Sequence, residues 1–243
     1  MLIKAALNGG RTRAEHPAIP ITPDELAASA KESVAAGARA IHFHVRDAAG
    51  RESLDPDDVA SALTAVRSAV PGTPIGTSTG AWILQNAALR LEKISHWRVL
   101  PDFASVNFKE EGALPLAQLL FSLGVAVEVG ISDLDGAKIF VNSGAAPNCL
   151  RLLLEPFEQT KAEALKTLED ILQLLSPASA ELPIVFHGLN LTAWDLLDEA
   201  ATRGYDTRIG FEDILTLPGG QFADGNAALV SEARRRLHQP RST

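Results

Sequence analysis

The sequence predicts an α/β protein that folds as a single (β/α)8 barrel over residues 1–243. Short apolar segments alternate with amphipathic helical segments eight times along the chain, and no linker or low-complexity tract divides it. Strands separated by helices form parallel crossover units, and eight such units, within a length of 243 residues, are typical of one closed barrel. A doubly wound open sheet is the alternative. It is disfavoured because no glycine-rich phosphate-binding turn follows the first strand.

The strands are predicted from short apolar runs that are too brief for helices. In chain order they span residues 2–8, 40–47, 74–80, 103–108, 126–132, 149–156, 182–189 and 206–213.

Each predicted strand is followed by a segment with helical periodicity. These segments span residues 22–37, 55–70, 86–97, 114–124, 134–144, 161–175, 192–204 and 226–238. Thr22 and Asp55 are each followed by a proline, which is the pattern of a capping residue before the first helical position. Gly37 is a typical helix end. The basic run at 234–236 is expected in the last turn of the final helix, where cations face the negative end of the helix dipole.

Composition and charge narrow the classes of partner. The formal net charge of -8 makes a nucleic acid or an anionic membrane an unexpected partner, because both require clustered Lys and Arg. The single cysteine, Cys149, excludes an internal disulfide and is expected to be a buried structural thiol. No apolar segment approaches 18 residues, and the first residues lack the features of a signal peptide. A cytoplasmic protein is therefore expected.

Chemically capable side chains gather near the end of nearly every predicted strand. In a barrel, the carboxyl ends of the strands carry the active site. The side chains in question are Asn8, Arg11, His42, His44, Arg46, Asp47, Thr77, Ser78, Thr79, Ser105, Asn107, Glu128, Glu155, His187, Asn190, Arg208, Glu212 and Asp213. This distribution favours an enzyme over a structural protein.

The pair His42 and His44 is the sharpest single signal. Residues i and i+2 of a strand point to the same side, so both imidazoles can face the barrel interior while Phe43 faces the helices. Two hydrogen-bonded core histidines are one interpretation, and two ligands of one divalent metal are the other. A third ligand would come from another strand end, with Glu212 and His187 as candidates. Zinc suits these donors, and iron or manganese would accept them too.

Two other groups near strand ends have a structural and a functional interpretation. The hydroxyls of the segment GTSTG at 76–80 either close a strand of small residues or hold a substrate oxygen. Arg208 either pairs with a carboxylate inside the barrel or anchors a substrate carboxylate. Asp213 is a candidate general base if the strand has already ended at that point.

Four segments together resemble the beta-keto acid cleavage enzyme family, and the resemblance covers nearly the whole chain. They are HPAIPITPDELAASAKESVAAGARAIHFHVRD at 16–47, STG at 78–80, PDFASVNF at 101–108 and RIGFEDILTLPGGQFADGNAALV at 208–230. The resemblance implies a zinc-dependent barrel that condenses a β-keto acid with acetyl-CoA and releases acetoacetate and a new acyl-CoA. It also implies a homo-oligomer, expected to be a tetramer.

The resemblance assigns roles by position. His42, His44 and Glu212 correspond to zinc ligands, Asp213 to the residue that abstracts a proton, and Arg208 to the neighbour that holds charge in place. The expected substrate-binding residues are Ser78, Thr79, Ser105, Asn107, Glu128 and Arg11. Among these, Ser78 is expected to bind the substrate carboxylate and Glu128 to lie near the variable part of the substrate.

Arg11 departs from the family pattern, in which a glutamate is common at about this position. A cation in place of an anion predicts a preference for a neutral or acidic β-keto acid over an amino-bearing one. The competing interpretation is that Arg11 is a solvated residue or pairs with Glu15 or Asp47.

Two other functions remain open from the sequence. One is a metal-dependent aldolase or hydrolase of a short keto acid that does not use CoA. The other is a non-catalytic barrel that binds a metabolite.

Overall fold

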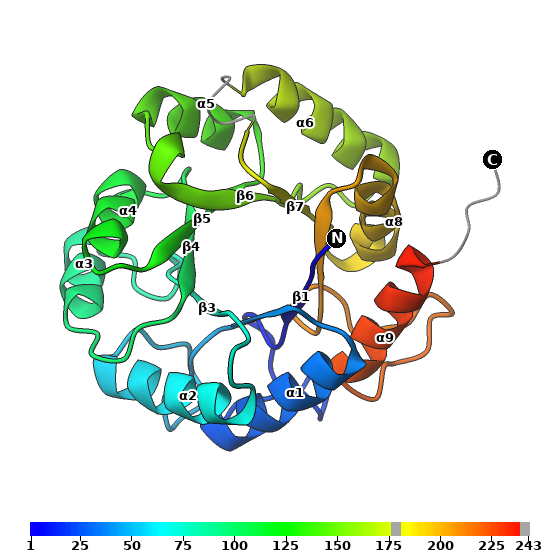
Figure 1. The fold of residues 1–243 in the computed structure, drawn as a ribbon, viewed down its shortest axis with the longest axis horizontal. Coiled ribbons are helices and arrows are strands. Elements are labelled where there is room, and N and C mark those ends of the chain that lie inside the picture. The colour runs from blue at the N-terminus through cyan, green and yellow to red at the C-terminus, as the bar shows by residue number, and fades with distance from the viewer. Residues whose placement is uncertain (176–180, 239–243) are drawn as a thin grey trace.

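The computed structural model describes residues 1–175 and 181–238, and shows a closed barrel of parallel strands surrounded by helices (Figure 1). The predicted fold is confirmed. Each strand pairs with its neighbours in chain order, and β8 closes on β1. The strands are β1 (Ile3–Ala6), β2 (Ala40–Phe43), β3 (Ile75–Ser78), β4 (Phe103–Asn107), β5 (Ala126–Ile131), β6 (Cys149–Leu154), β7 (Ile184–Phe186) and β8 (Asp206–Ile209).

Helices cover the outside of the barrel. They are α1 (Pro23–Ala36), α2 (Pro56–Ala69), α3 (Ala87–Ser95), α4 (Ala113–Ser122), α5 (Leu134–Ser143), α6 (Lys161–Leu174), α8 (Ala193–Arg203) and α9 (Asn226–Leu237). Two short 3-10 turns, η1 (Ala146–Asn148) and η2 (Asn190–Thr192), precede β6 and α8.

The predicted helix boundaries are confirmed where the sequence has capping signals. Thr22 accepts a hydrogen bond from the backbone N–H of Glu25, and the Glu25 carboxylate accepts one from the backbone N–H of Thr22. Asp55 accepts a hydrogen bond from the N–H of Asp57 at 3.1 Å, and Gly37, with φ 124°, is the capping residue that follows the last residue of α1. The basic run at 234–236 lies in the last turn of α9, as expected.

The strands end earlier than the apolar runs that predicted them. The second run was expected to continue to residue 47, but β2 ends at Phe43, and the eighth was expected to reach residue 213, but β8 ends at Ile209. The extra residues leave the ladder of backbone hydrogen bonds and curve around the mouth of the barrel. His44, Glu212 and Asp213 therefore lie in the loops just beyond the strands.

The two faces of the strands differ in polarity. Apolar side chains on the outer face, such as Phe43, belong to the continuous core between strands and helices. Inside the barrel, Lys4, Glu128 and Arg151 form a group that we call the closed cluster. Glu128 pairs with Lys4 and, at 2.6 Å, with Arg151, and Lys4 and Glu128 are completely buried.

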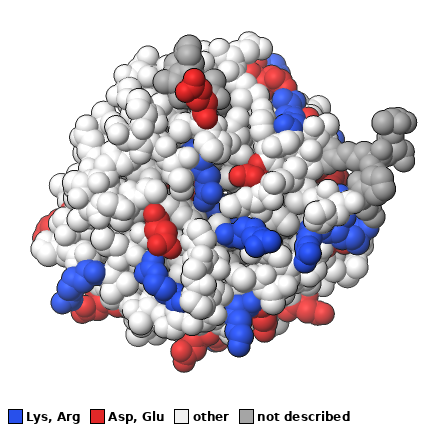
Figure 2. Space-filling view, viewed as in Figure 1, with Lys and Arg blue, Asp and Glu red and all other residues white. Residues whose placement is uncertain are grey.

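Charges on the surface are mixed. Figure 2 shows one face of the molecule, on which Lys and Arg side chains are interspersed with Asp and Glu. Within residues 1–175 and 181–238, no helix has both the length and the apolar character needed to cross a bilayer.

Candidate metal centre and active site

His42, His44 and Glu212 converge at the carboxyl ends of the strands, and we call them the metal cluster. One possible ligand atom from each lies within 4.8 Å of the others. Nε2 of His42 is 3.6 Å from Oε2 of Glu212, and Nε2 of His44 is 3.3 Å from Oε1 of the same carboxylate. Oε2 of Glu212 is buried without a hydrogen bond. Two imidazoles and a carboxylate that has an unpaired buried oxygen suit a divalent metal such as zinc, with positions left for water or substrate.

Asn8 holds His44 in place beyond the end of β2. Its amide accepts a hydrogen bond from the backbone N–H of His44 at 2.8 Å and donates one to the backbone carbonyl of His44 at 2.9 Å. The side chain thus replaces the pairing that a neighbouring strand would provide. His44 stays ordered although it is no longer part of the sheet.

Gly9 makes room for the third member of the metal cluster. Its φ of 52° lies in the left-handed region, and a Cβ at this position would lie 2.3 Å from Cγ of Glu212. A side chain at position 9 would therefore be strained and would displace Glu212. The turn after β8 completes the placement, because Glu212 donates its N–H to the carbonyl of Ala6 at 3.2 Å.

The two histidines have opposite pKa shifts. Burial lowers the pKa of His42 well below its ordinary value, because the charged imidazole loses its hydration. Burial also acts on His44, but the charge of Glu212 and hydrogen bonds to Glu212 and Glu52 outweigh it and raise the pKa of His44 to about 9. Burial would raise the pKa of Glu212, yet Arg208 and both histidines hold it well below the usual range. The Glu212 carboxylate is therefore charged, which is the state that a carboxylate needs in order to bind a metal.

Arg208 ties the metal cluster to Asp213. Nη2 of Arg208 lies 2.6 Å from Oδ1 of Asp213 and 2.9 Å from Oε1 of Glu212. Because β8 ends at Ile209, the following turn brings both carboxylates around one guanidinium, which meets the condition set for Asp213 in the sequence. Asp213 is completely buried. Its side chain is not part of the pocket lining.

Glu52 is a residue of the site that the sequence reasoning missed. Its Oε1 lies 2.5 Å from Nδ1 of His44 and also accepts the indole N–H of Trp82 at 3.0 Å. The Trp82 ring stacks near His44, with centroids 5.9 Å apart and planes at 25°. A carboxylate on the second nitrogen of a ligating histidine fixes the orientation of that ring. Glu52 follows the HxH motif by eight residues, in a loop without periodicity, so no sequence pattern marked it.

A pocket of about 280 Å³ opens beside the metal cluster. It is lined by Gly10, His42, His44, Glu52, Ser78, Trp82, Ser105, Asn107, Leu153, Glu155, Phe157, Leu189, Arg208 and Glu212. Three of the expected substrate-binding residues, Ser78, Ser105 and Asn107, are therefore placed where a ligand can reach them.

The structure does not place the other three expected substrate-binding residues in the pocket lining. The hydroxyl of Thr79 donates to the carbonyl of Ser105 at 2.7 Å, which is a structural hydrogen bond. Glu128 belongs to the closed cluster and is 0% exposed, so this placement does not support the expected contact with substrate. Its charge is satisfied by Lys4, from β1 across the barrel, and by Arg151, from the neighbouring strand β6.

Arg11 is held at the rim, outside the pocket lining. It pairs with Glu15 at 3.0 Å and donates to the side-chain oxygen of Asn190 at 2.6 Å and to the carbonyl of Glu212 at 3.3 Å. The pairing with Glu15 is the competing interpretation from the sequence, and it leaves the guanidinium already satisfied.

His187, the other candidate third ligand, is not part of the metal cluster. Its ring is completely buried, with Nε2 3.3 Å from Glu155 and Nδ1 3.6 Å from Asp213. Glu212 takes the third position instead.

Cys149 lies at the start of β6 and is only partly buried. Burial raises the pKa of its thiol to about 11, and Sγ contacts the carbonyl of Ala145 at 3.4 Å. These contacts agree with the expected structural role, although the thiol is less buried than expected.

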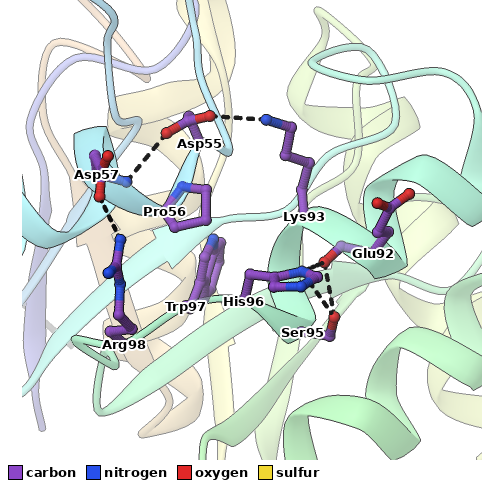
Figure 3. A pocket seen from close by; sticks show the side chains of 9 residues that line it. All are labelled: Asp55, Pro56, Asp57, Glu92, Lys93, Ser95, His96, Trp97 and Arg98. Carbon is purple, nitrogen blue, oxygen red and sulfur yellow. Dashed lines mark hydrogen bonds and ion pairs between the residues drawn. The ribbon is translucent and has the colours of Figure 1, made fainter.

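A larger hollow of about 650 Å³ lies on the outside, between the start of α2 and the end of α3 (Figure 3). Its two aspartates are paired with basic side chains of the same hollow, Asp55 with Lys93 at 2.7 Å and Asp57 with Arg98 at 2.6 Å. With these charges already paired at the surface, the hollow has none of the unsatisfied buried atoms that mark the metal cluster.

A family model described as beta-keto acid cleavage enzyme matches residues 1–241. A 3-keto-5-aminohexanoate cleavage enzyme of Fusobacterium nucleatum is 25% identical over 252 aligned positions, covering 97% of this chain and 90% of that protein. A 3-oxoadipate:acetyl-CoA acetyltransferase of Cupriavidus necator is 36% identical over 106 positions, covering 43% of this chain and 36% of that protein.

Solved structures with the same fold have lower identity. The apo structure of ObcA superimposes with a TM-score of 0.68 at 19% identity, covering 90% of this chain, which spans 61% of that protein's length. The tryptophan synthase alpha subunit of Legionella pneumophila superimposes with a TM-score of 0.60 at 13% identity, covering 97% of this chain and 92% of the other. At these sequence identities, the similarity shows a shared fold and nothing about function.

Proposed function

Because the chain belongs to the beta-keto acid cleavage enzyme family, we propose that it is a zinc-dependent enzyme that cleaves a β-keto acid with acetyl-CoA as the second substrate. The products are acetoacetate and the CoA thioester of the remaining acyl group. The acetyl group joins the two-carbon fragment that bears the substrate carboxylate, and the CoA released from acetyl-CoA leaves on the other acyl group. The exchange needs no oxidant or reductant.

The metal cluster is the observation that carries this proposal. Its three ligands lie at the carboxyl ends of barrel strands, beside a pocket, with one buried carboxylate oxygen unpaired. A divalent metal bound there would polarise the keto group and ease the loss of the α-proton. Zinc is the proposed ion because two imidazoles and one carboxylate match its catalytic sites.

The chain's own residues supply the other functions. Ser78 lies in the pocket lining, next to Gly80, whose N–H donates to the Ser78 hydroxyl at 3.3 Å. We assign Ser78 to the substrate carboxylate. Arg208 pairs with both Glu212 and Asp213 and holds the two carboxylates in place. By family position Asp213 takes the α-proton, and its complete burial restricts this step to a substrate that reaches past the metal cluster.

Acetyl-CoA as co-substrate is supported by the name of the Cupriavidus necator relative, an acetyl-CoA acetyltransferase. The resemblance to the family also predicts a homotetramer.

Turnover with and without acetyl-CoA tests the function. The purified protein, loaded with zinc, is incubated with a series of β-keto acids, and acetoacetate and new acyl-CoA are quantified. Both products should form only with acetyl-CoA, and a chelator should abolish them. Loss of the keto acid without acetyl-CoA, faster than in the absence of protein, would instead identify a metal-dependent aldolase or hydrolase. No protein-dependent loss under either condition would overturn the proposed activity.

A further inference from the structure

The pocket has two chemically different sides. His42, His44 and Glu212 lie on one side, carried by β2 and the turn after β8. The opposite side, which we call the far side, consists of Ser105, Asn107, Leu153, Glu155 and Leu189. In a closed ring of eight strands β6 lies directly across from β2, so a substrate held by its carboxylate end at the metal cluster extends toward the residues after β6.

Glu155 is the charged residue of the far side. Its side chain is 12% exposed and contributes to the pocket lining. Around it Leu153, Phe157 and Leu189 are apolar, and Ser105 and Asn107 are neutral. Electrostatic interactions of a carboxylate in such partly dry surroundings are stronger than at an open surface.

The groups beside Glu155 leave it available to a ligand. Its ion-pair contact is with His187, whose Nε2 lies 3.3 Å from Oε2. His187 is 0% exposed, and neither of its ring nitrogens makes a hydrogen bond. A buried imidazole without hydrogen bonds beside a pocket carboxylate is an incompletely satisfied polar pair.

The cations near the pocket already have carboxylate partners. Arg208, the one Arg or Lys in the described pocket lining, contacts Glu212 and Asp213. Arg11 contacts Glu15 and Asn190 at the rim. Arg208 also interacts electrostatically with Glu155, so three carboxylates share this one guanidinium. Neither arginine provides a free cation for a second carboxylate on the substrate.

We infer that Glu155 determines specificity by receiving the distal end of the β-keto acid, and that it favours an end bearing an ammonium or another hydrogen-bond donor over a carboxylate. The inference rests on the proposed function, and it reverses the preference that Arg11 alone predicted. A distal carboxylate would meet a like charge, whereas an ammonium would complete the hydrogen bonding of Glu155. A site that binds a hydrogen-bond donor also disfavours a ligand without a donor, because the polar groups of the site then stay unpaired.

The test compares three β-keto acids: 3-keto-5-aminohexanoate with a cationic end, 3-oxohexanoate with a neutral end and 3-oxoadipate with an anionic end. Their dissociation constants are measured by calorimetry on the zinc-loaded protein without acetyl-CoA, and kcat/KM is measured with it. We expect the amino-bearing acid to be favoured over 3-oxoadipate at least about tenfold in both quantities.

Glu155→Gln removes the charge at nearly constant shape, and should reduce this ratio at least about tenfold while changing 3-oxohexanoate less than about threefold. Glu158→Gln, which removes a carboxylate outside the pocket lining, serves as the matched control and should leave the ratio unchanged. A wild-type protein that prefers 3-oxoadipate, a ratio unaffected by Glu155→Gln, or binding of none of the acids would overturn the inference. Selective binding without turnover would support the inference and overturn the proposed function.

Discussion

Two groups of charged residues lie inside the barrel, and they differ in how well their atoms are satisfied. In the closed cluster Glu128 is held between Lys4 and Arg151, and the guanidinium of Arg151 also lies 4.9 Å from the centre of the Phe103 ring. The metal cluster opens to a pocket and contains unpaired buried atoms, Nδ1 of His42 and Oε2 of Glu212. Lys4 lies two residues before Ala6, the register partner of His42, so it is nearer the amino-terminal end of the barrel.

This difference shows that an inward charge on a barrel strand is not by itself a functional signal. Glu128 and Glu212 are both carboxylates that enter the barrel interior, but only Glu212 combines access to a ligand with an unsatisfied oxygen. We therefore interpret the closed cluster as structural and the metal cluster as functional. The predictions that follow separate the two roles.

The largest effect is expected on turnover when the metal cluster is broken. His44→Ala should reduce kcat/KM by about a thousandfold or more, because the metal's contribution to transition-state stabilisation amounts to several kcal/mol. The unfolding free energy of the metal-free protein should change far less. His96→Ala, a histidine in the outer hollow of Figure 3, is the matched control and should retain activity. Equal activities of the two variants would remove the metal cluster from the active site.

The closed cluster should respond in stability instead. Glu128→Ala leaves Lys4 and Arg151 buried without a counter-charge and should cost about 3–5 kcal/mol of unfolding free energy, measured by urea denaturation. The combined replacement of Lys4 by Met, Glu128 by Leu and Arg151 by Met should recover most of that loss. If Glu128→Ala kept its stability and lost substrate affinity, Glu128 would belong to the binding site as the sequence first indicated.

A pH dependence of the closed cluster follows from the same contacts. Burial would raise the pKa of Glu128, but Lys4 and Arg151 hold it at about 2, below the ordinary 4.5. A lowered folded-state pKa stabilises the protein above pH 4.5, and this contribution is lost as the pH falls toward 2, up to about 3 kcal/mol. Unfolding free energies of the wild type and Glu128→Gln should converge over this range. If the two curves of unfolding free energy against pH stayed parallel, the ion pairs of Glu128 would contribute nothing to the loss of stability at low pH.

Replacing Glu52 should change zinc binding at the metal cluster, with a smaller effect than the changes above. Glu52→Gln weakens the hydrogen bond that orients His44, and zinc affinity should fall about 10–100-fold in a competition titration with a chromophoric chelator. Glu92→Gln, an exposed carboxylate on α3, is the control and should bind zinc like the wild type. If Glu52→Gln bound zinc as tightly as the wild type, the role of Glu52 would be confined to its hydrogen bond with Trp82.

The smallest effect is expected at Arg11. Arg11→Gln should change the ratio of kcat/KM for 3-keto-5-aminohexanoate and 3-oxoadipate less than about threefold, because Glu15 and Asn190 already satisfy this guanidinium at the rim. A larger rise of the ratio would restore Arg11 as the determinant of the substrate end.

The fold and the metal cluster could be predicted because their signals are local. Strand and helix periods repeat along the chain, HxH spacing places two imidazoles on one side of a strand, and Glu212 lies in a block typical of the family. The remaining features depend on side-chain contacts that the order of the strands does not determine. The partners of Glu128 come from positions 4 and 151, and Glu52 reaches back to His44 from a loop.

Hydrophobic periodicity also could not predict the residue at which each strand ends. Apolar residues continue past the last sheet hydrogen bond in β2 and β8, so the predicted strands were too long. Asn8 explains how His44 remains fixed after β2 has ended, and this depends on a side-chain to backbone contact between residues 36 apart.

The most direct test of the central claim follows the acetyl group. The zinc-loaded protein is mixed with a β-keto acid and acetyl-CoA that carries 13C at the acetyl carbonyl, and the products are analysed by NMR. The account predicts that the label appears in the keto carbon of acetoacetate, with one unlabelled acyl-CoA formed for each labelled acetoacetate. Unlabelled acetoacetate, or cleavage of the keto acid with the label still in acetyl-CoA, would contradict it.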